Sequence, residues 1–162
     1  MDLQTKIAEY VIGQLGYHHL PALAEEALSN DLDSESLRIL AGLDEKSSED
    51  DVKFYFNRSV KELGYSIPEI KDAIWFMVKN VARRIVTGSL DEYDGGLLIY
   101  EYLRVWPDHE IPDILWKYKI CTSRIKDWLF LMKDDGTDVT KKINSEKKEI
   151  REISESLLKH HP

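Results

Sequence analysis

Apolar residues recur at helical spacing along almost the whole chain, and this pattern limits the fold more than any other feature. Leu3, Ile7 and Val11 lie four residues apart, and Val52 and Phe56 begin a second series of the same kind. Such spacing places apolar side chains on one face of a helix. No segment of strand length alternates convincingly between apolar and polar residues. The sequence therefore predicts an all-α protein, a single-domain helical bundle of about seven or eight helices.

One predicted helix differs from the others in being apolar on more than one face. It spans residues 67–87 and follows Ser66-Ile67-Pro68-Glu69, in which the serine, the early proline and the acid form a capping box. Because a helix that is apolar on most sides must be covered by other elements, we expect it to lie centrally. Glycines at positions 16, 64 and 88 are placed to end helices.

The second half of the chain contains a glycine-rich turn and a highly charged final helix. Residues 88–96 are read as a polar turn, with a helix over 97–106 after it. After residue 132 a loop leads to a helix whose outer face is charged and whose apolar stripe is narrow. We therefore expect a globular domain over 1–132, with residues 133–162 packing on it or on a partner.

Negative charge is concentrated in the first third of the chain. The protein has 162 residues and a net charge of −8 with a pI near 5.1, and residues 1–51 hold twelve acids against three bases. An acidic chain is a poor nucleic-acid binder, so no nucleic-acid partner is expected. The uneven distribution allows three interpretations: a solvated face, a docking surface for a basic protein, or weak cation binding.

Catalytic and metal-binding patterns are not found in the sequence. The only cysteine, Cys121, lies within an apolar helical stripe, where cysteine usually behaves as a small buried hydrophobe. The adjacent pair His18-His19 would diverge on a helix and could not share a metal. We therefore predict no catalytic residues, no metal and no cofactor. The longest apolar run, Ala73–Val78, is too short to span a membrane, and the expected location is the cytoplasm.

Several segments resemble a pattern found in small helical bacterial proteins. They are Leu37-Arg38-Ile39-Leu40-Ala41-Gly42-Leu43, Glu62-Leu63-Gly64, Ala82-Arg83-Arg84-Ile85-Val86-Thr87-Gly88 and Gly95-Gly96-Leu97-Leu98-Ile99-Tyr100-Glu101. The likeness covers about residues 35–130, and some proteins of this kind resemble immunity proteins associated with secreted toxins. It consists of helix ends and core residues, so it implies a fold and brings no active-site residues.

The leading functional prediction is a non-enzymatic bacterial interaction protein, most like an acidic immunity protein or antitoxin. Its partner would be a basic protein such as a toxin domain, because nucleases that bind phosphate backbones tend to be basic. The carboxylates would steer association and nearby aromatic side chains would anchor it. The predicted partner-binding residues are Glu25, Glu26, Asp31, Asp33, Asp44, Glu45, Glu49, Asp50, Asp51, Tyr17, Phe54 and Tyr55.

Two alternatives remain open at this point. The first is a small-molecule or enzymatic role in a pocket near the central helix, formed by Arg83, Arg84, Tyr93 and Glu101. The second is homodimerisation through the narrow apolar stripe of residues 138–159. A deep pocket with converging polar groups would favour the first alternative.

Overall fold

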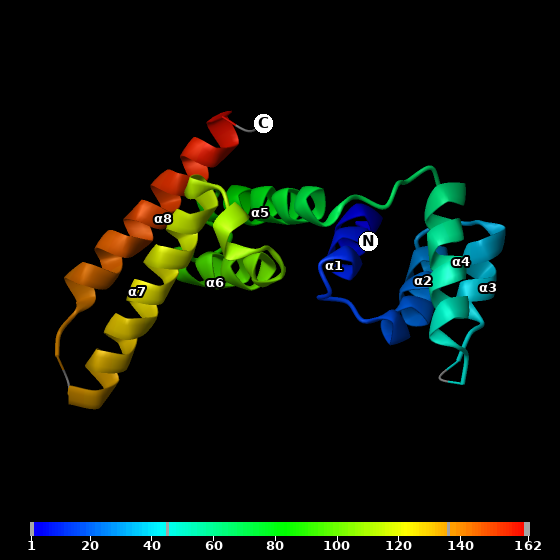
Figure 1. Cartoon of the computed structure of the whole chain (residues 1–162), viewed down its shortest axis with the longest axis horizontal. Helices are drawn as coiled ribbons and strands as arrows, with labels where there is room; N and C mark the ends of the chain where they lie inside the picture. The colour runs from blue at the N-terminus through cyan, green and yellow to red at the C-terminus, as the bar shows by residue number, and fades with distance from the viewer. Residues whose placement is uncertain (1, 45, 136, 161–162) are drawn as a thin grey trace. The chain divides into compact units, whose positions relative to one another are not determined.

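The protein is helical throughout the part of the chain that its structure, a computed structural model, describes: residues 2–44, 46–135 and 137–160. Within these ranges there is no strand, and the all-α prediction is confirmed (Figure 1). The α-helices are α1 (Leu3–Val11), α2 (Leu20–Ser29), α3 (Glu35–Ala41), α4 (Glu49–Glu62), α5 (Ile70–Val86), α6 (Glu92–Tyr102), α7 (Asp113–Asp135) and α8 (Thr140–His160). Three short 3₁₀ turns accompany them: η1 (Tyr17–His19), η2 (Leu103–Val105) and η3 (Asp108–Glu110).

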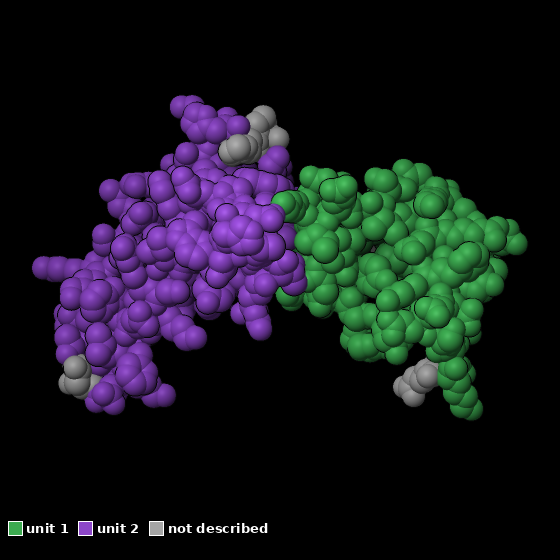
Figure 2. All heavy atoms as spheres, viewed as in Figure 1, with its two compact units in different colours: residues 1–73 green, residues 74–162 purple. Residues whose placement is uncertain are grey.

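The chain divides into two compact units, shown in separate colours in Figure 2. Unit 1 is Met1–Ala73 and unit 2 is Ile74–Pro162, so the division falls within α5 rather than near residue 132. Residues 133–162, which were expected to pack on the globular domain or on a partner, belong to unit 2, where α8 packs against α7 and α6. The division also separates charge, because unit 1 holds fifteen acids and seven bases whereas unit 2 holds fifteen of each.

Unit 1 has its own apolar core. Side chains from α1, α2, α3 and α4 meet there, with Ile7, Leu20, Leu40 and Val60 each no more than 1% exposed. Short connections join α2 to α3 and α3 to α4, and each successive pair of helices is packed together. Consecutive helices joined in this way run antiparallel, so α2 and α4 point in the same direction.

A partly buried hydrogen-bond cluster connects the beginning of α3 to the end of α4. The backbone N–H of Ser36 donates to Glu62 Oε2 at 2.9 Å, and the Ser36 hydroxyl donates to Oε1 at 2.8 Å. Arg58 Nε also donates to Glu62 Oε1, at 2.8 Å. These bonds favour the ionised carboxylate, with the Ser36 backbone bond the strongest cause, and lower the pKa of Glu62 to about 2.

The depressed pKa of Glu62 predicts acid sensitivity of unit 1. A carboxylate with a lower pKa in the folded state stabilises folding above its ordinary value of 4.5, and this stabilisation disappears as the pH falls toward about 2. We expect Glu62→Gln to lower the urea midpoint of unit 1 at pH 7, with a difference from wild type that shrinks through this range. Far-UV circular dichroism at several pH values measures it. The control is Glu25→Gln, and a midpoint difference that does not vary with pH would contradict the prediction.

Unit 2 is built on a buried pairing of α7 with α8, with α6 packed on both helices (Figure 1). Leu115, Ile125, Ile150 and Leu157 are fully buried. The hydroxyl groups of Tyr118 and Ser154 lie 2.9 Å apart, and this hydrogen bond joins α7 to α8 inside the core. The apolar residues of α8 are therefore used within unit 2.

Two basic residues of α8 bind the corner between α5 and α6. Arg151 donates to Glu92 Oε1 from Nε at 2.9 Å and from Nη2 at 2.6 Å, and its Nη1 donates to the Val86 carbonyl at 3.2 Å. One turn earlier, Lys147 donates to Asp91 Oδ2 at 2.6 Å. The end of α5 thus receives a donor for one of the carbonyls that a helix end leaves free.

The glycine pair that was expected to lie in a turn lies inside a helix. Gly95 and Gly96 are both buried in α6, which begins at Glu92 instead of near residue 97. A Cβ atom at Gly96 would lie 2.4 Å from Thr122 Oγ1, and one at Gly95 would lie 2.5 Å from Ile85 Cδ1. Glycine is required here for close helix packing and not for turn geometry, which explains why the interpretation as a turn was wrong.

Other predicted helix ends agree better with the structure. Gly64 and Gly88 have φ values of 80° and 75° and follow the ends of α4 and α5. The first helix ends earlier than expected, at Val11, and the glycine with positive φ that follows it is Gly13, with φ 76°, rather than Gly16. None of the described helices combines the length and the apolar character needed to cross a bilayer.

Candidate partner-binding surface

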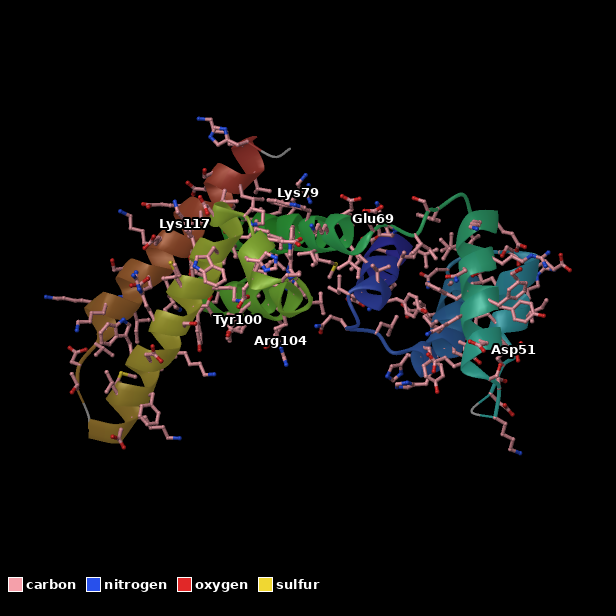
Figure 3. All side chains as sticks on the ribbon, in the orientation of Figure 1. Asp51, Glu69, Lys79, Tyr100, Arg104 and Lys117 are labelled. Atoms are coloured by element: carbon pink, nitrogen blue, oxygen red, sulfur yellow. The ribbon has the colours of Figure 1, made fainter. Side chains whose placement is uncertain are left out.

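Most of the predicted acidic residues that the structure describes fall at two ends of the packed helices α2, α3 and α4. Asp31 and Asp33 lie in the connection before α3, at the end where Ser36 meets Glu62. Asp44 and the acids that open α4 lie at the opposite end, where the chain reverses between α3 and α4. Asp51 is labelled there in Figure 3. Glu45 lies outside the described residues.

The two acidic ends are too far apart to act as one surface. Helix α4 has 14 residues, which at about 1.5 Å per residue gives roughly 20 Å between its ends. The Debye length at physiological ionic strength is only about 8 Å. The charges at the two ends are therefore screened from one another. Glu25 and Glu26 lie between these ends, exposed on α2.

Several of the predicted acids already have structural partners. Asp33 forms an ion pair with Arg38, and this hydrogen bond lowers the pKa of Asp33. Asp51 accepts from the hydroxyl of Ser48, which caps α4, and Glu49 Oε1 lies 2.5 Å from Lys53 Nζ. Asp44 accepts from the backbone N–H of Lys46 and so closes a tight turn. These four acids therefore stabilise local structure in addition to contributing negative charge.

Four other predicted acids are open to a partner. Among the described residues, Glu25, Glu26, Asp31 and Asp50 form no ion pair. All four are exposed. Asp31 also has a φ of 62°, the left-handed conformation, which follows the end of α2. Carboxylates that are exposed and unpaired are those that can form new ion pairs without breaking an existing one.

Exposed aromatic side chains lie next to the acids at the beginning of α4. Phe54 is 57% exposed and lies one helical turn after Asp50 and Asp51. Its ring meets that of Tyr55 edge-on, with 5.2 Å between ring centroids, and Tyr55 in turn packs on the core of unit 1. We call Glu49, Asp50, Asp51 and Phe54 together the α4 patch.

Tyr17 belongs to the same end of unit 1. It is 37% exposed and lies in η1, which precedes α2 and packs against α4. Because α2 and α4 point in the same direction, the beginning of α2 lies beside the beginning of α4. The structure therefore brings Tyr17 to the end of unit 1 that carries the α4 patch. Asp44, in the loop before α4, lies at this end too. Asp31 and Asp33 lie at the other end.

The alternative pocket residues of unit 2 come from two helices. Arg83 and Arg84 are exposed in the last turn of α5, and Arg83 donates to Asn80 of the same helix at 2.8 Å. Tyr93 and Glu101 lie eight residues apart in α6, about 12 Å along the helix. Glu101 forms an ion pair with Arg104, at 2.9 Å. These four residues occupy two helices and several turns, and among the described residues no hydrogen bond or ion pair joins one of them to another, so their forming one pocket stays a prediction.

A cavity does exist beside Glu101, with other residues. Its volume is about 280 Å³, and it lies between α6 and α7, where Figure 3 labels Tyr100. The lining residues are Leu97, Tyr100, Glu101, Thr122, Ser123, Lys126 and Asp127. The α7 residues of this set were not among the predicted site residues. The one available signal was their spacing, since residues 122, 123, 126 and 127 share one face of a helix.

No protein-family model matches the chain, and neither a curated protein nor a solved structure was found that matches it.

Proposed function

We propose that the protein is a non-enzymatic interaction protein that uses unit 1 to bind a basic protein partner, in the manner of an acidic immunity protein. The observation that carries this proposal is the separation of charge. Unit 1 has a net charge of −8, equal to that of the whole protein, and unit 2 is neutral. A charge difference between two units of one chain gives the acidic unit a field that attracts cations and basic proteins.

The α4 patch is the favoured contact point. It combines carboxylates, one of them unpaired, with a phenylalanine that is more than half exposed. Aromatic residues are frequent anchors at protein interfaces, whereas exposed charges mainly raise the rate of association. In this mechanism the carboxylates of unit 1 orient the approach of the partner. Phe54 and Tyr17 then enter apolar sites on its surface. A toxin encoded beside this gene would be the first partner to test.

The cavity between α6 and α7 supports a second candidate function, the binding of a small polar molecule. The polar residues that line it, Glu101, Ser123, Lys126 and Asp127, offer charged and hydroxyl groups to such a molecule. By contrast, the stripe on α8 that suggested a homodimer is buried inside unit 2, so it offers little support for that alternative.

Charge neutralisation in unit 1 tests the leading proposal. Full-length protein is immobilised, a partner is captured at low salt, and its association rate is then measured. The test variant combines Glu25→Gln, Glu26→Gln, Asp31→Asn and Asp50→Asn. We expect the association rate at low salt to fall about 10- to 100-fold, since electrostatic steering raises such rates by that order. The rate should also depend less on salt than it does for wild type.

A second variant with the same change in net charge serves as the control. It combines Asp94→Asn, Asp113→Asn, Asp134→Asn and Glu155→Gln, all exposed positions in unit 2. We expect its association rate to stay within about threefold of wild type, because these charges lie outside unit 1. Equal losses in both variants would mean that only total charge matters. Capture of partners that are not basic would also contradict the proposal.

A further inference from the structure

A thiol and two carboxylates from different helices come together in unit 2. Cys121 of α7 is 1% exposed, and Glu146 and Glu149 lie three residues apart on α8, which packs along α7 (Figure 1). One donor atom from each of the three side chains lies within 4.8 Å of the other two. Donors around a tetrahedral zinc ion are roughly 3.5 Å apart, given Zn–S and Zn–O distances of about 2.3 and 2.0 Å. Small side-chain movements would therefore close a metal site.

The carboxylate of Glu146 is incompletely satisfied in a nearly closed environment. Its Oε2 atom is shut off from solvent and has no hydrogen-bond partner among the described residues, and the side chain is only 14% exposed. Its other oxygen, Oε1, lies 3.5 Å from Arg124 Nη1, at the limit of a hydrogen bond. A buried carboxylate oxygen without a donor is costly, and a bound cation is one of the groups that can satisfy it.

We propose that Cys121, Glu146 and Glu149 form a binding site for a divalent cation of the zinc class. One thiolate and two carboxylates combine a soft donor with two hard ones, and zinc accepts both kinds. The three side chains leave a fourth position for water. On binding, the sulfur–hydrogen bond of Cys121 is replaced by a sulfur–metal bond and the proton passes to solvent, so no redox change occurs.

Without metal, the thiol of Cys121 keeps its proton. Burial, the negative charges of Glu149 and Glu146, and a hydrogen bond with Glu146 raise the pKa of Cys121 to about 12. The thiol is therefore protonated at neutral pH, and it is a poor nucleophile. The same two carboxylates that disfavour a bare thiolate would favour a cation beside it. Arg124 acts in the opposite direction, because its positive charge lies next to Glu146.

Cobalt and cadmium titrations of the full-length protein test the proposal. Both ions give thiolate-to-metal absorption bands, and Cys121 is the only cysteine in the chain, so a band reports on this site alone. We expect one equivalent of Co²⁺ to produce the band and Zn²⁺ to displace it. Histidine sites elsewhere in the chain cannot produce this signal.

Single substitutions assign the ligands. Cys121→Ser should abolish the band, and Glu149→Gln should weaken Co²⁺ binding about 100-fold or more, because even partners of metal ligands cost about 10- to 100-fold when removed. Arg124→Gln should strengthen binding. Glu152→Gln is the control, since Glu152 is exposed on the same helix and pairs with Lys148. Glu149 is also exposed, so its substitution should leave the fold intact. Absence of a band in wild type, or equal affinity in Glu149→Gln and Glu152→Gln, would overturn the proposal.

Discussion

Replacing Ile150 by alanine is expected to lower the free energy of unfolding of unit 2 by about 3 kcal/mol, within the range measured for core isoleucines. Ile150 is fully buried on α8, and its Cδ1 atom lies 3.2 Å from the position that a Cβ of Gly96 would occupy. Truncation would leave a cavity where α6, α7 and α8 meet. All four tryptophans of the chain lie in unit 2, so tryptophan fluorescence during urea unfolding reports on this unit separately.

Urea unfolding at several protein concentrations distinguishes burial of Ile150 within one chain from burial in a homodimer interface. If Ile150 is buried within one chain, the loss should be the same at low and high protein concentration. If it instead lay in a homodimer interface, the urea midpoint of wild type would rise with concentration and that of Ile150→Ala would rise less. Ile120→Ala is the control. Ile120 of α7 is 37% exposed, so removing the same atoms should cost less than about 1 kcal/mol.

The sequence pattern identified most helices because local signals set them, but it placed the beginnings of α5 and α6 at residues 67 and 97 instead of 70 and 92. Ser48 caps α4 by accepting from the backbone N–H of Asp51 at 3.1 Å, and serine is a residue type that favours this position. Gly64 and Gly88 follow helix ends for the same local reason. The division of the chain within α5 was not predictable in this way. Periodicity identifies which face of a helix is buried, but it does not identify the element that covers that face.

The candidate sites show the same distinction between local and tertiary information. Counting residues shows that acids are concentrated in the first 51 residues. That these acids lie at two opposite ends of the packed helices depends on the change of chain direction between α3 and α4. Cys121 and Glu146 are 25 residues apart and meet only because α7 and α8 pack together. No fixed spacing in the sequence records such a meeting. The interpretation of Cys121 as a buried residue was nevertheless correct.

The second large loss of stability is expected from a substitution at Gly96, where the packing leaves no space for a side chain. Gly96→Val is expected to destabilise unit 2 by about 3 kcal/mol, at the upper end of the cost of overpacking a core. The new Cβ would clash with Thr122 Oγ1 at 2.4 Å, and Ile150 Cδ1 lies close on another side. Valine and glycine differ little in helix propensity, so packing should decide the result. Urea unfolding followed by tryptophan fluorescence measures the loss.

Removing Thr122 Oγ1, the atom with which the new side chain would clash, tests directly whether this clash causes the loss of stability. Thr122→Ala alone should be close to neutral, because it deletes a buried hydroxyl that has no hydrogen-bond partner among the described residues. Combined with Gly96→Val, it should restore at least about 1 kcal/mol, a coupling typical of residues in contact. Leu97→Val, at an exposed neighbouring position, should cost only about 0.5 kcal/mol. If the two substitutions are instead additive, the contact between Gly96 and Thr122 does not limit the approach of α6 to α7.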